Sequence, residues 1–529
     1  MVLWAVPSFV STSRRLRFIR LGKPRDLSVI YRDFLKMTES PQVPTSGPAS
    51  PFRSPDFVKL FLTNIAEFCG ATLFKLATLQ FLYEATASGL ALGGLGFVML
   101  IAMVPSTLYG GILADQVDRK RLVAACMAVA FALCAFLAVM EACGWLRAWH
   151  IYVVTAIHQA ARRLEGSARG ALVATTVPAP SIPNAISIVT LVQQAGEVFA
   201  PVLFGAAAMF PSLAPAFFLG ALSYAPAALL PLYIGASGLA NGATVSVKGG
   251  FAAIASLVEG VRYILGHPLL PGLYVLDWGM TLFTFYRELF PFFVAILFTE
   301  ARLGLSARQA AAALTIANYS GGTLGSSLTL LFNSYQYKGR AVCLATLAYG
   351  AFASLIGSTP LLPVGMACVA LCGAADAVGM TFRKTVVLVT TPDHLRGRAQ
   401  AGHSLAANVA NALGQMYVAA MGTLVGLPAT MALGGALTWA AVGLAVWRIP
   451  ELWRDSSGRA AAGSGSEAQA STQQHETAPD QGSDEPPSPA VTGRGMSQGS
   501  SRLLPEGAHS ACASDCGSSA GPQHTCETR

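Results

Sequence analysis

The chain has 529 residues, of which 53% are hydrophobic and 12% are charged, and its formal net charge at pH 7 is +8. Soluble domains carry about a quarter charged residues, so this chain lacks the polar surface that a water-soluble fold requires. The stretches 97–114, 122–140 and 431–447 hold no charged residue, and each approaches the roughly 20 residues that span a bilayer. These features exclude a soluble protein and predict an all-α membrane protein with many spans.

A basic leader, residues 1–55, precedes the first apolar stretch. Eight Lys and Arg residues lie between Arg14 and Lys36, and only Asp26 and Asp33 oppose them. Such a segment is typical of an organelle-targeting sequence or of a helix on a membrane surface. The alternative that we favour is a start at Met37, with the leader either disordered or not part of the protein.

Twelve apolar stretches follow, and we predict a transmembrane helix in each. Their approximate limits are 57–83, 89–113, 122–144, 150–177, 185–210, 215–237, 269–299, 307–333, 341–358, 363–391, 399–424 and 428–448. A linker, 237–268, divides them into an N-terminal six-helix bundle, 56–236, and a C-terminal six-helix bundle, 269–449.

The linker and the tail have different compositions. In the linker, apolar residues recur at helical spacing from Phe251 to Leu265, which predicts an amphipathic helix along the cytoplasmic membrane surface. The tail, 450–529, consists mainly of small and polar residues, with hardly a large apolar one. Because it cannot bury enough apolar surface to fold, we expect a disordered cytoplasmic tail.

The distribution of Lys and Arg predicts the topology. Alternate loops hold most of the cations: Arg119, Lys120, Arg121, Lys248, Arg262, Lys338, Arg340, Arg396 and Arg398. The other loops hold little beyond Arg147 and Arg302. By the positive-inside rule, both termini face the cytoplasm of a cell membrane, which in a bacterium is the inner membrane. These basic loops explain the positive net charge, so we expect no nucleic-acid partner.

The two halves of the chain resemble each other. At an offset of 214 residues, Gly111 corresponds to Gly325, Arg169 to Arg383, and Pro178 to Pro392 with one gap allowed nearby. Matches at one offset, between corresponding helices, predict two pseudo-symmetric bundles. Parallel repeats with a site between them at the bilayer midplane are an architecture of transporters.

The turn between the second and third stretches is unusually charged. Its residues follow the pattern G-x-L-A-D-x-x-G-R-K, except for Asp118 in place of the second glycine: Gly111, Leu113, Ala114, Asp115, Arg119 and Lys120. This pattern resembles the loop signature of the major facilitator superfamily. Residues 57–448 are similar to the drug- and siderophore-exporter branch typified by the enterobactin exporter, chiefly in 83–93, 177–187, 259–270 and 395–405.

The resemblance implies a gating loop that clamps the two halves together on the cytoplasmic side. Its residues would be Gly111, Asp115, Arg119 and Lys120. An aspartate at a helix end can accept hydrogen bonds from a neighbouring helix N-terminus and pair with an arginine, which agrees with a clamp. The alternative is that the cations only fix the topology. In the second half the pattern is eroded, and Thr329 stands where Asp115 would map.

Charged and amide side chains inside the predicted spans form the candidate proton and substrate cavity. A charge in mid-bilayer costs about 2.5–3.5 kcal/mol, so each requires a partner or an aqueous cavity. The candidates are Glu67, Lys75, Arg162, Glu165, Glu197, Asp277, Glu288, Asp376, Asn408 and Asn411. Helical spacing places Arg162, Glu165 and Arg169 on one stripe, with Arg163 pointing elsewhere. It also aligns Asp277 and Glu288 on one face of the seventh helix, with Arg287 to the side.

Several of these residues have plainer interpretations. Arg169, Arg383 and Lys384 lie near the cytoplasmic ends of their helices, where snorkelling or helix clamping explains them. Lys75, Arg287 and Glu288 are candidates for structural pairs. Glu67 and Asp277 have no opposite charge one turn away in their own helices, and together with Glu197 they are the candidates for proton or substrate work.

Two further patterns concern coupling. Arg162 with Gly166 is similar to the R-x-x-x-G signature of the fourth helix of the superfamily, which the resemblance links to proton transfer. Residues 196–205 are similar to the antiporter pattern G-x-x-x-G-P-x-x-G-G, with Ala200 and Phe204 in place of two glycines.

These patterns predict a monomeric, proton-coupled exporter of a small molecule by alternating access, in contact with the lipid bilayer. An uptake carrier or lysophospholipid transporter on the same fold is one alternative, and a transport-inactive receptor or scaffold is another. No phosphate loop, H-E-x-x-H motif or nucleophile elbow is present in the sequence, so we do not expect an enzyme. Seven cysteines lie in apolar stretches and three in the tail, and we expect neither a metal site nor a cofactor.

Overall fold

The computed structural model describes residues 50–235, 259–260, 262–298, 304–331 and 337–454. All of them belong to one unit of the chain, 1–467. The expectations for residues 1–49, for most of the linker and for 455–529 lie outside the described residues. At the start of the predicted tail, Glu451–Arg454 form the short helix α16, and the side chain of Leu452 is buried.

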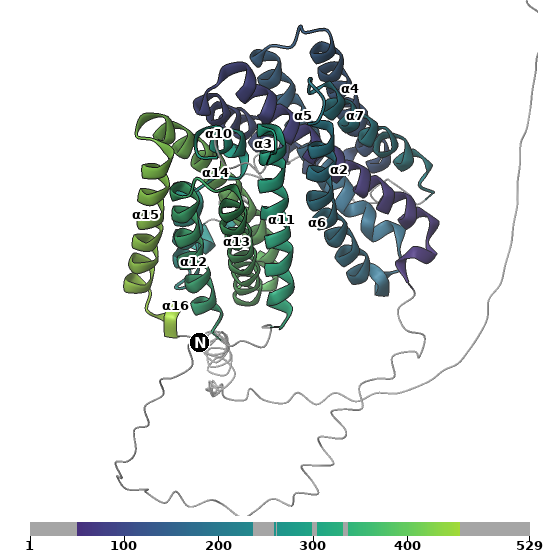
Figure 1. The fold of residues 1–529 in the computed structure, drawn as a ribbon. Coiled ribbons are helices and arrows are strands. Elements are labelled where there is room, and N and C mark those ends of the chain that lie inside the picture. Colours follow the sequence, from purple (N-terminus) through teal and green to yellow (C-terminus); the bar gives the residue numbers. More distant parts are fainter. Residues whose placement is uncertain (1–49, 236–258, 261, 299–303, 332–336, 455–529) are drawn as a thin grey trace, which may run out of the picture. The chain divides into compact units, whose positions relative to one another are not determined.

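The described residues are almost entirely helical (Figure 1). The N-terminal half contains α2 (Pro55–Thr86), α3 (Gly89–Gln116), α4 (Arg119–Ala142), α5 (Ala148–Thr176), α6 (Ile182–Ala207) and α7 (Ala214–Leu229), which the turn η3 (Leu230–Tyr233) extends. The C-terminal half contains α9 (Leu270–Phe283), η4 (Arg287–Leu289), α10 (Phe290–Ile296), α11 (Ala307–Leu331), α12 (Lys338–Ser358), α13 (Leu362–Thr390), α14 (Asp393–Leu424) and α15 (Leu427–Arg448).

Each predicted span coincides with a helix of the described part, or with two in the case of the seventh. By length and composition, eight of these helices can cross a membrane: α2, α3, α4, α6, α7, α12, α13 and α15. Helix α5 is more polar because it carries Arg162, Arg163, Glu165 and Arg169, and α9 is short, with 14 residues. The count of twelve spans therefore stays a prediction.

The charged turn between α3 and α4 has a clear local cause. The carboxylate of Asp118 accepts a hydrogen bond from the backbone N–H of Lys120 at 3.0 Å and so caps the N-terminus of α4. An aspartate at this position satisfies one of the unpaired N–H groups of the first turn. The residue that departs from the loop signature is therefore the one that starts the next helix.

The seventh helix is broken, which the sequence did not predict. Helix α9 ends at Phe283, and α10 starts only at Phe290. Pro291 has no N–H to donate to the carbonyl of Arg287, so a helix cannot continue through this point undisturbed. The expected stripe of Asp277 and Glu288 on one helical face is therefore wrong, because Glu288 lies in η4 rather than in α9.

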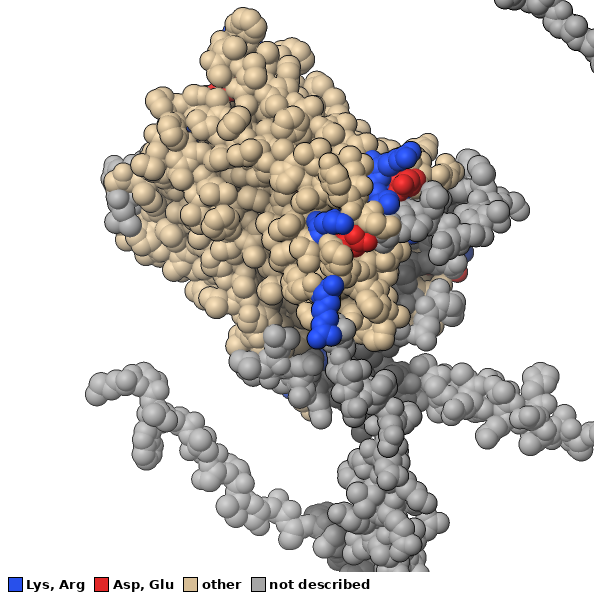
Figure 2. Space-filling model, turned by 90° about the vertical axis from the view of Figure 1, so that its right-hand side faces the viewer, with Lys and Arg blue, Asp and Glu red and all other residues tan. Residues whose placement is uncertain are grey.

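The surface of the helices agrees with a lipid environment. Many large apolar side chains are exposed, among them Phe199, Phe218 and Leu222. Figure 2 shows a broad face of the molecule with few charged atoms. Exposed aromatic residues lie near helix ends, with Trp145 and Trp149 around the start of α5 and Trp447 at the end of α15. Aromatic side chains at such positions are typical of membrane–water interfaces.

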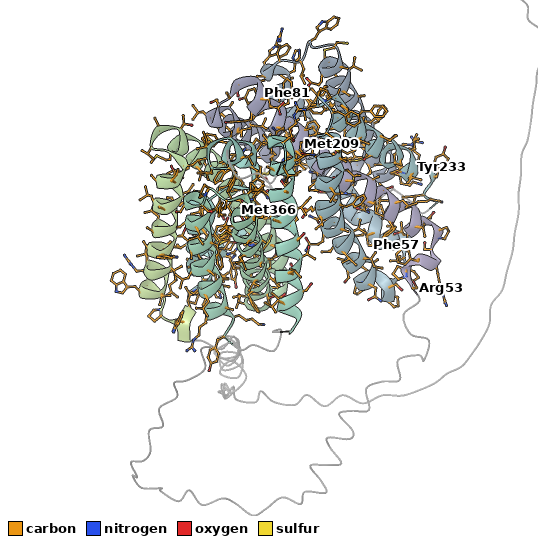
Figure 3. The ribbon with its side chains drawn as sticks, viewed as in Figure 1. Arg53, Phe57, Phe81, Met209, Tyr233 and Met366 are labelled. Atoms are coloured by element: carbon orange, nitrogen blue, oxygen red, sulfur yellow. The ribbon has the colours of Figure 1, made fainter. Side chains whose placement is uncertain are left out.

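One end of each half, here called the basic end, carries cations at the start of a helix: Arg119 and Lys120 in α4, and Lys338 and Arg340 in α12. Hydrogen bonds join the helix ends there. In the N-terminal half, Ser54 Oγ donates to the carbonyl of Thr176 at 2.7 Å, and Lys120 Nζ donates to that of Ile234 at 2.9 Å. In the C-terminal half, Tyr263 Oη donates to the carbonyl of Thr390 at 2.9 Å. Figure 3 shows Arg53 at this end of the N-terminal half and Phe81 towards the opposite end.

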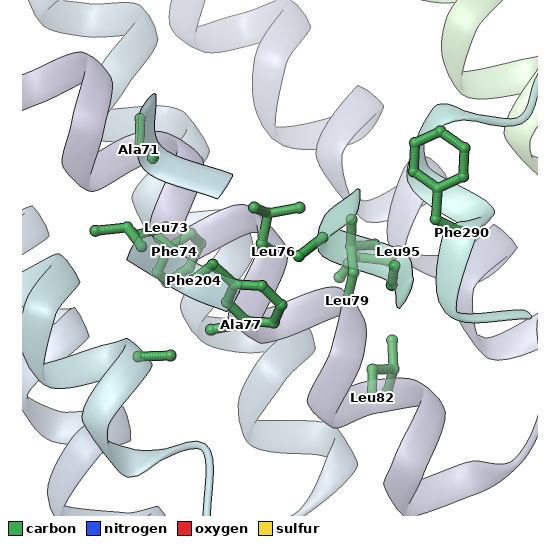
Figure 4. Packing of buried hydrophobic residues seen from close by; sticks show 14 of the residues in the cluster. Ala71, Leu73, Phe74, Leu76, Ala77, Leu79, Leu82, Leu95, Phe204 and Phe290 are labelled. Atoms are coloured by element: carbon green, nitrogen blue, oxygen red, sulfur yellow. The ribbon is translucent and has the colours of Figure 1, made fainter. Parts of the chain in front are cut away.

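The halves pack against each other through α3 with α14 and α6 with α11. A methyl group at Gly93 of α3 would lie 2.9 Å from Cβ of Ala419 in α14, so the glycine permits close approach. Nearby, Gln415 Nε2 donates to the carbonyl of Leu92 at 2.8 Å. One buried apolar cluster runs through both halves and includes Leu79, Leu95 and Phe290 (Figure 4).

Candidate functional site

A cavity of about 1110 Å³ lies between the two halves. Helices α2, α3, α5 and α6 of the N-terminal half line it, together with α11, α13, α14 and the segment around η4. Towards the basic end, its wall includes Arg169, Thr329 and Lys384, which lie within about two turns of the ends of their helices. Leu79, Leu95 and Thr155 of the wall lie equally close to the opposite ends of their helices, so the cavity spans the middle of the helices and reaches towards both ends.

The structure distributes the predicted cavity residues over two layers. Those that line the cavity are Lys75, Arg162, Glu197, Glu288, Asp376, Asn408 and Asn411. The other three, Glu67, Glu165 and Asp277, are buried and do not line it. Two carboxylates that the sequence singled out for proton or substrate work, Glu67 and Asp277, thus lie behind the wall.

Glu67 joins α2 to α5. Its fully buried carboxylate lies 2.6 Å from Nη2 of Arg162 and 2.5 Å from Nη1 of Arg169. Arg169 also lies 3.2 Å from Glu165, one turn earlier on α5. Both oxygens of Glu165 are buried without a hydrogen bond. Arg162, Glu165 and Arg169 do share one stripe of α5, and that stripe faces Glu67.

The C-terminal half contains a related pair. Arg383 of α13 is buried, and its Nη2 lies 2.7 Å from the carboxylate of Asp277 in α9. Arg383 corresponds to Arg169 at the offset of 214 residues. Each half therefore holds an arginine of its fourth helix against an acid of its first helix. Helix clamping describes both arginines, and snorkelling is wrong for Arg383.

Lys75 connects the two halves near the middle of the cavity. Its Nζ donates to Tyr319 Oη of α11 at 3.0 Å and lies 3.5 Å from the carboxylate of Glu288. The sequence had no signal for Tyr319, because only the tertiary fold brings its hydroxyl to Lys75.

Two arginines that were expected to point away line the cavity. Arg287 lies 3.5 Å from Asp376 and donates to Asn411 Oδ1 at 3.4 Å. It reaches these partners because the break in the seventh helix changes its direction. Arg163 of α5 donates to Asn408 Oδ1 of α14 at 3.3 Å, which links the two halves.

The structure describes only part of the predicted gating loop. The backbone of Gly111 and Asp115 belongs to α3, but the side chain of Asp115 lies outside the described part of the structure. Arg119 is the first residue of α4. Lys120 donates to the carbonyl of Ile234, which belongs to its own half. The clamp stays a prediction.

An ion pair with two short contacts joins the halves at the end opposite to the basic end. Arg308 of α11 donates to both carboxylate oxygens of Glu84 in α2, each at 2.7 Å. Its Nη1 also donates to the carbonyls of Phe210 and Pro211 at 3.1 Å. One side chain thus ties three segments together: the end of α2, the loop before α7 and the start of α11.

Within the described residues, no group of three or more His, Cys, Asp or Glu side chains is placed to hold a metal ion. The sequence matches no family model and no curated protein.

Solved transporter structures are similar to this fold. The nucleoside transporter NupG is 15% identical with a TM-score of 0.59, and the match covers 74% of this chain and 99% of that one. A variant of the peptide transporter POT is 13% identical with a TM-score of 0.62, covering 75% and 95%. A bacterial homologue of the human lysosomal transporter Spinster, in an inward-facing and unoccupied conformation, is 16% identical with a TM-score of 0.55, covering 78% and 98%.

Identities this low show the fold and not the substrate. The chain is an all-α membrane protein with the two-bundle fold of major facilitator transporters.

Proposed function

We propose that the chain is a secondary active transporter that exports a small molecule by alternating access and couples this movement to protons. The observation that carries the proposal is the cavity between the two halves, whose wall takes charged side chains from both of them. A site on the surface of one half would not require residues of both halves to share one wall. Transporters of two repeats bind their substrates at such a place.

The contacts between the halves support alternating access. The ion pair of Glu84 and Arg308 holds the two halves together at the end opposite to the basic end. The positive-inside rule assigns the basic end to the cytoplasm. The arrangement is therefore that of an inward-facing state, and the opposite state requires Arg308 to release Glu84.

Proton coupling rests on the buried carboxylates. A proton can move the equilibrium between two states only if its affinity differs between them. Glu67 is held by Arg162 and Arg169, and Asp277 by Arg383. Protonation of either acid would remove the charge that holds its arginine, so the contacts of the half would change. Glu67 and Asp277 are the leading proton sites, followed by Glu197 and Asp376.

Export, and a place in the enterobactin-exporter branch, rest on the sequence resemblance alone. Uptake and lysophospholipid transport on the same fold remain the alternatives within transport. A receptor or scaffold without transport activity would not require ion pairs that break between states. The proposal also places the chain in a cell membrane as a monomer, with both termini in the cytoplasm.

Proteoliposomes with an imposed pH gradient test the proposal. A panel of drugs and siderophores serves as the set of substrates, and empty liposomes serve as the control. Glu67→Gln and Asp277→Asn are compared with the parent chain in the same membranes. Loss of gradient-driven flux with substrate exchange retained would identify the coupling acid. A parent chain that moves substrate but ignores the gradient would contradict proton coupling, and one that moves none of the panel would contradict drug or siderophore export.

A further inference from the structure

The charges on the cavity wall are unequal in number. Six cationic side chains line it: Lys75, Arg162, Arg163, Arg169, Arg287 and Lys384. Only three carboxylates do so: Glu197, Glu288 and Asp376. A cavity with low-dielectric walls and an excess of one sign attracts ligands of the opposite sign.

Most of these charges already have a partner of opposite sign. Glu67 neutralises Arg162 and Arg169 from behind the wall, and Asp376 lies against Arg287. Lys75 lies against Glu288. These pairs hold helices together within a half or between halves, so they are not available to a ligand without breaking an existing contact.

Two wall cations are different. Among the described residues, neither Arg163 nor Lys384 has a carboxylate within ion-pair distance, and the only polar contact of Arg163 is the neutral amide of Asn408 at 3.3 Å. A cation at this depth in a membrane requires a counter-charge or water. Arg163 lies near the middle of α5, whereas Lys384 lies less than two turns from the end of α13. They mark a deep and a shallow position along the cavity.

One stretch of the cavity wall is apolar. Helix α3 contributes Leu95, Met99, Leu100 and Met103 to the cavity and no charged side chain. Methionine side chains are flexible and polarisable, so they adapt to apolar ligands of varied shape. The cavity therefore presents an apolar face on one helix and, on others, two cations without an ion-pair partner among the described residues, against one such carboxylate, Glu197.

We propose that this cavity binds an amphipathic organic anion, that is, a carboxylate, sulfonate or phosphate ester with a hydrocarbon or aromatic body. The acidic group binds Arg163, whose planar guanidinium offers two parallel donors to such groups. Lys384 attracts the anion nearer the basic end, and the apolar body packs on α3. This assignment names the substrate class of the transporter proposed above and rests on that function.

The test compares three ligands that share one body and differ in charge: naphthalene-2-sulfonate, 2-naphthalenemethanol and 2-naphthylmethylammonium. Binding to the purified full chain in detergent is measured by calorimetry. The anion is expected to bind at least about tenfold more tightly than either other ligand. Inorganic sulfate, which has the charge without the body, is expected to bind much more weakly. Preference for the ammonium ligand, or equal binding of all three, would overturn the proposal.

Variants assign the effect to the two cations. Arg163→Gln and Lys384→Gln should each weaken binding of the sulfonate, with Arg163→Gln weakening it by about tenfold or more, and should leave the neutral ligand within about twofold. Arg163→Lys and Lys384→Arg keep the charge and should restore much of the affinity. Arg448→Gln removes an exposed cation outside the cavity wall and serves as the matched control. Unchanged sulfonate affinity in both Gln variants would contradict the assignment, and size-exclusion profiles identify any variant that fails to fold.

Flux measurements separate this inference from the proposed function. If the sulfonate binds as expected but is never carried across proteoliposomes, the anion site stands and the transport proposal fails. If the chain carries a cationic or neutral compound and does not bind the sulfonate, transport stands and the anion site is wrong.

Discussion

Arg308 and Glu84 form a two-point ion pair, with both donor–acceptor distances at 2.7 Å, between the C-terminal and the N-terminal half. Glu84 lies in the stretch 83–93 that resembles the exporter branch, but nothing in the sequence pairs it with Arg308. Both are partly exposed, so the pair is close enough to water for its strength to be moderate. A contact of moderate strength suits a joint that must open in every transport cycle.

Glu84→Gln is expected to favour the outward-open state, because it removes the charge that binds Arg308. Losing about 1 kcal/mol would change the ratio of the two states roughly fivefold. Trp145 and Leu361 lie in different halves, at the end opposite to the basic end. Spin labels at these two positions should show a larger population of molecules with a long distance between the labels. Lys59→Gln breaks an ion pair inside one half and should not change the distances. An unchanged distance distribution in Glu84→Gln would show that this pair does not hold the halves together.

Glu67→Ala is expected to destabilise the chain strongly. It leaves Arg162 and Arg169 without the buried carboxylate that they share, and removing one partner of a buried ion pair typically costs about 3–5 kcal/mol. A thermal unfolding scan of the purified protein should show the loss. Glu197→Ala is the comparison, because among the described residues Glu197 accepts a hydrogen bond from Gln193 alone, at 3.2 Å, and should matter much less. Equal stability of the two variants would mean that the contacts of Glu67 with Arg162 and Arg169 do not stabilise the fold.

Asp115→Asn is expected to impair transport while the protein still reaches the membrane. The basis is the resemblance of residues 111–120 to a gating loop, together with the place of Asp115 near the end of α3. Flux at equal surface expression is the measurement. Normal kinetics in this variant would leave the cations of the loop with a role in topology alone.

Gly434→Ala is expected to destabilise the C-terminal half by about 1–3 kcal/mol, the usual cost of overpacking. A methyl group at this position would lie 2.2 Å from the carbonyl oxygen of Phe283, the last residue of α9. Gly443 lies on the same helix with no neighbour within 4 Å of such a methyl group, so Gly443→Ala is a matched control that should be neutral or slightly stabilising. Thermal unfolding of both variants compares them directly.

The apolar stretches predicted the positions of the helices well, because a membrane span is defined by its own composition. The stripe of Arg162, Glu165 and Arg169 on α5 was also predicted, since helical spacing alone decides it. The sequence could not show that this stripe faces Glu67, because residues about 100 positions apart meet only through tertiary packing. Nor could it place Arg287 on the cavity wall, since this depends on the break before Pro291.

The break between α9 and α10 divides one predicted span into two helices that contact different parts of the molecule. Helix α9 carries Asp277, which Arg383 holds within the C-terminal half. Helix α10 carries Phe292, whose ring lies 6.1 Å from that of Tyr83 in the other half and would clash with a methyl group at Gly89. No continuous helix joins α9 to α10. A displacement of Phe292 therefore need not displace the ion pair of Asp277 and Arg383. The two helices of this span are therefore anchored separately, α9 to its own half and α10 to the other half as well.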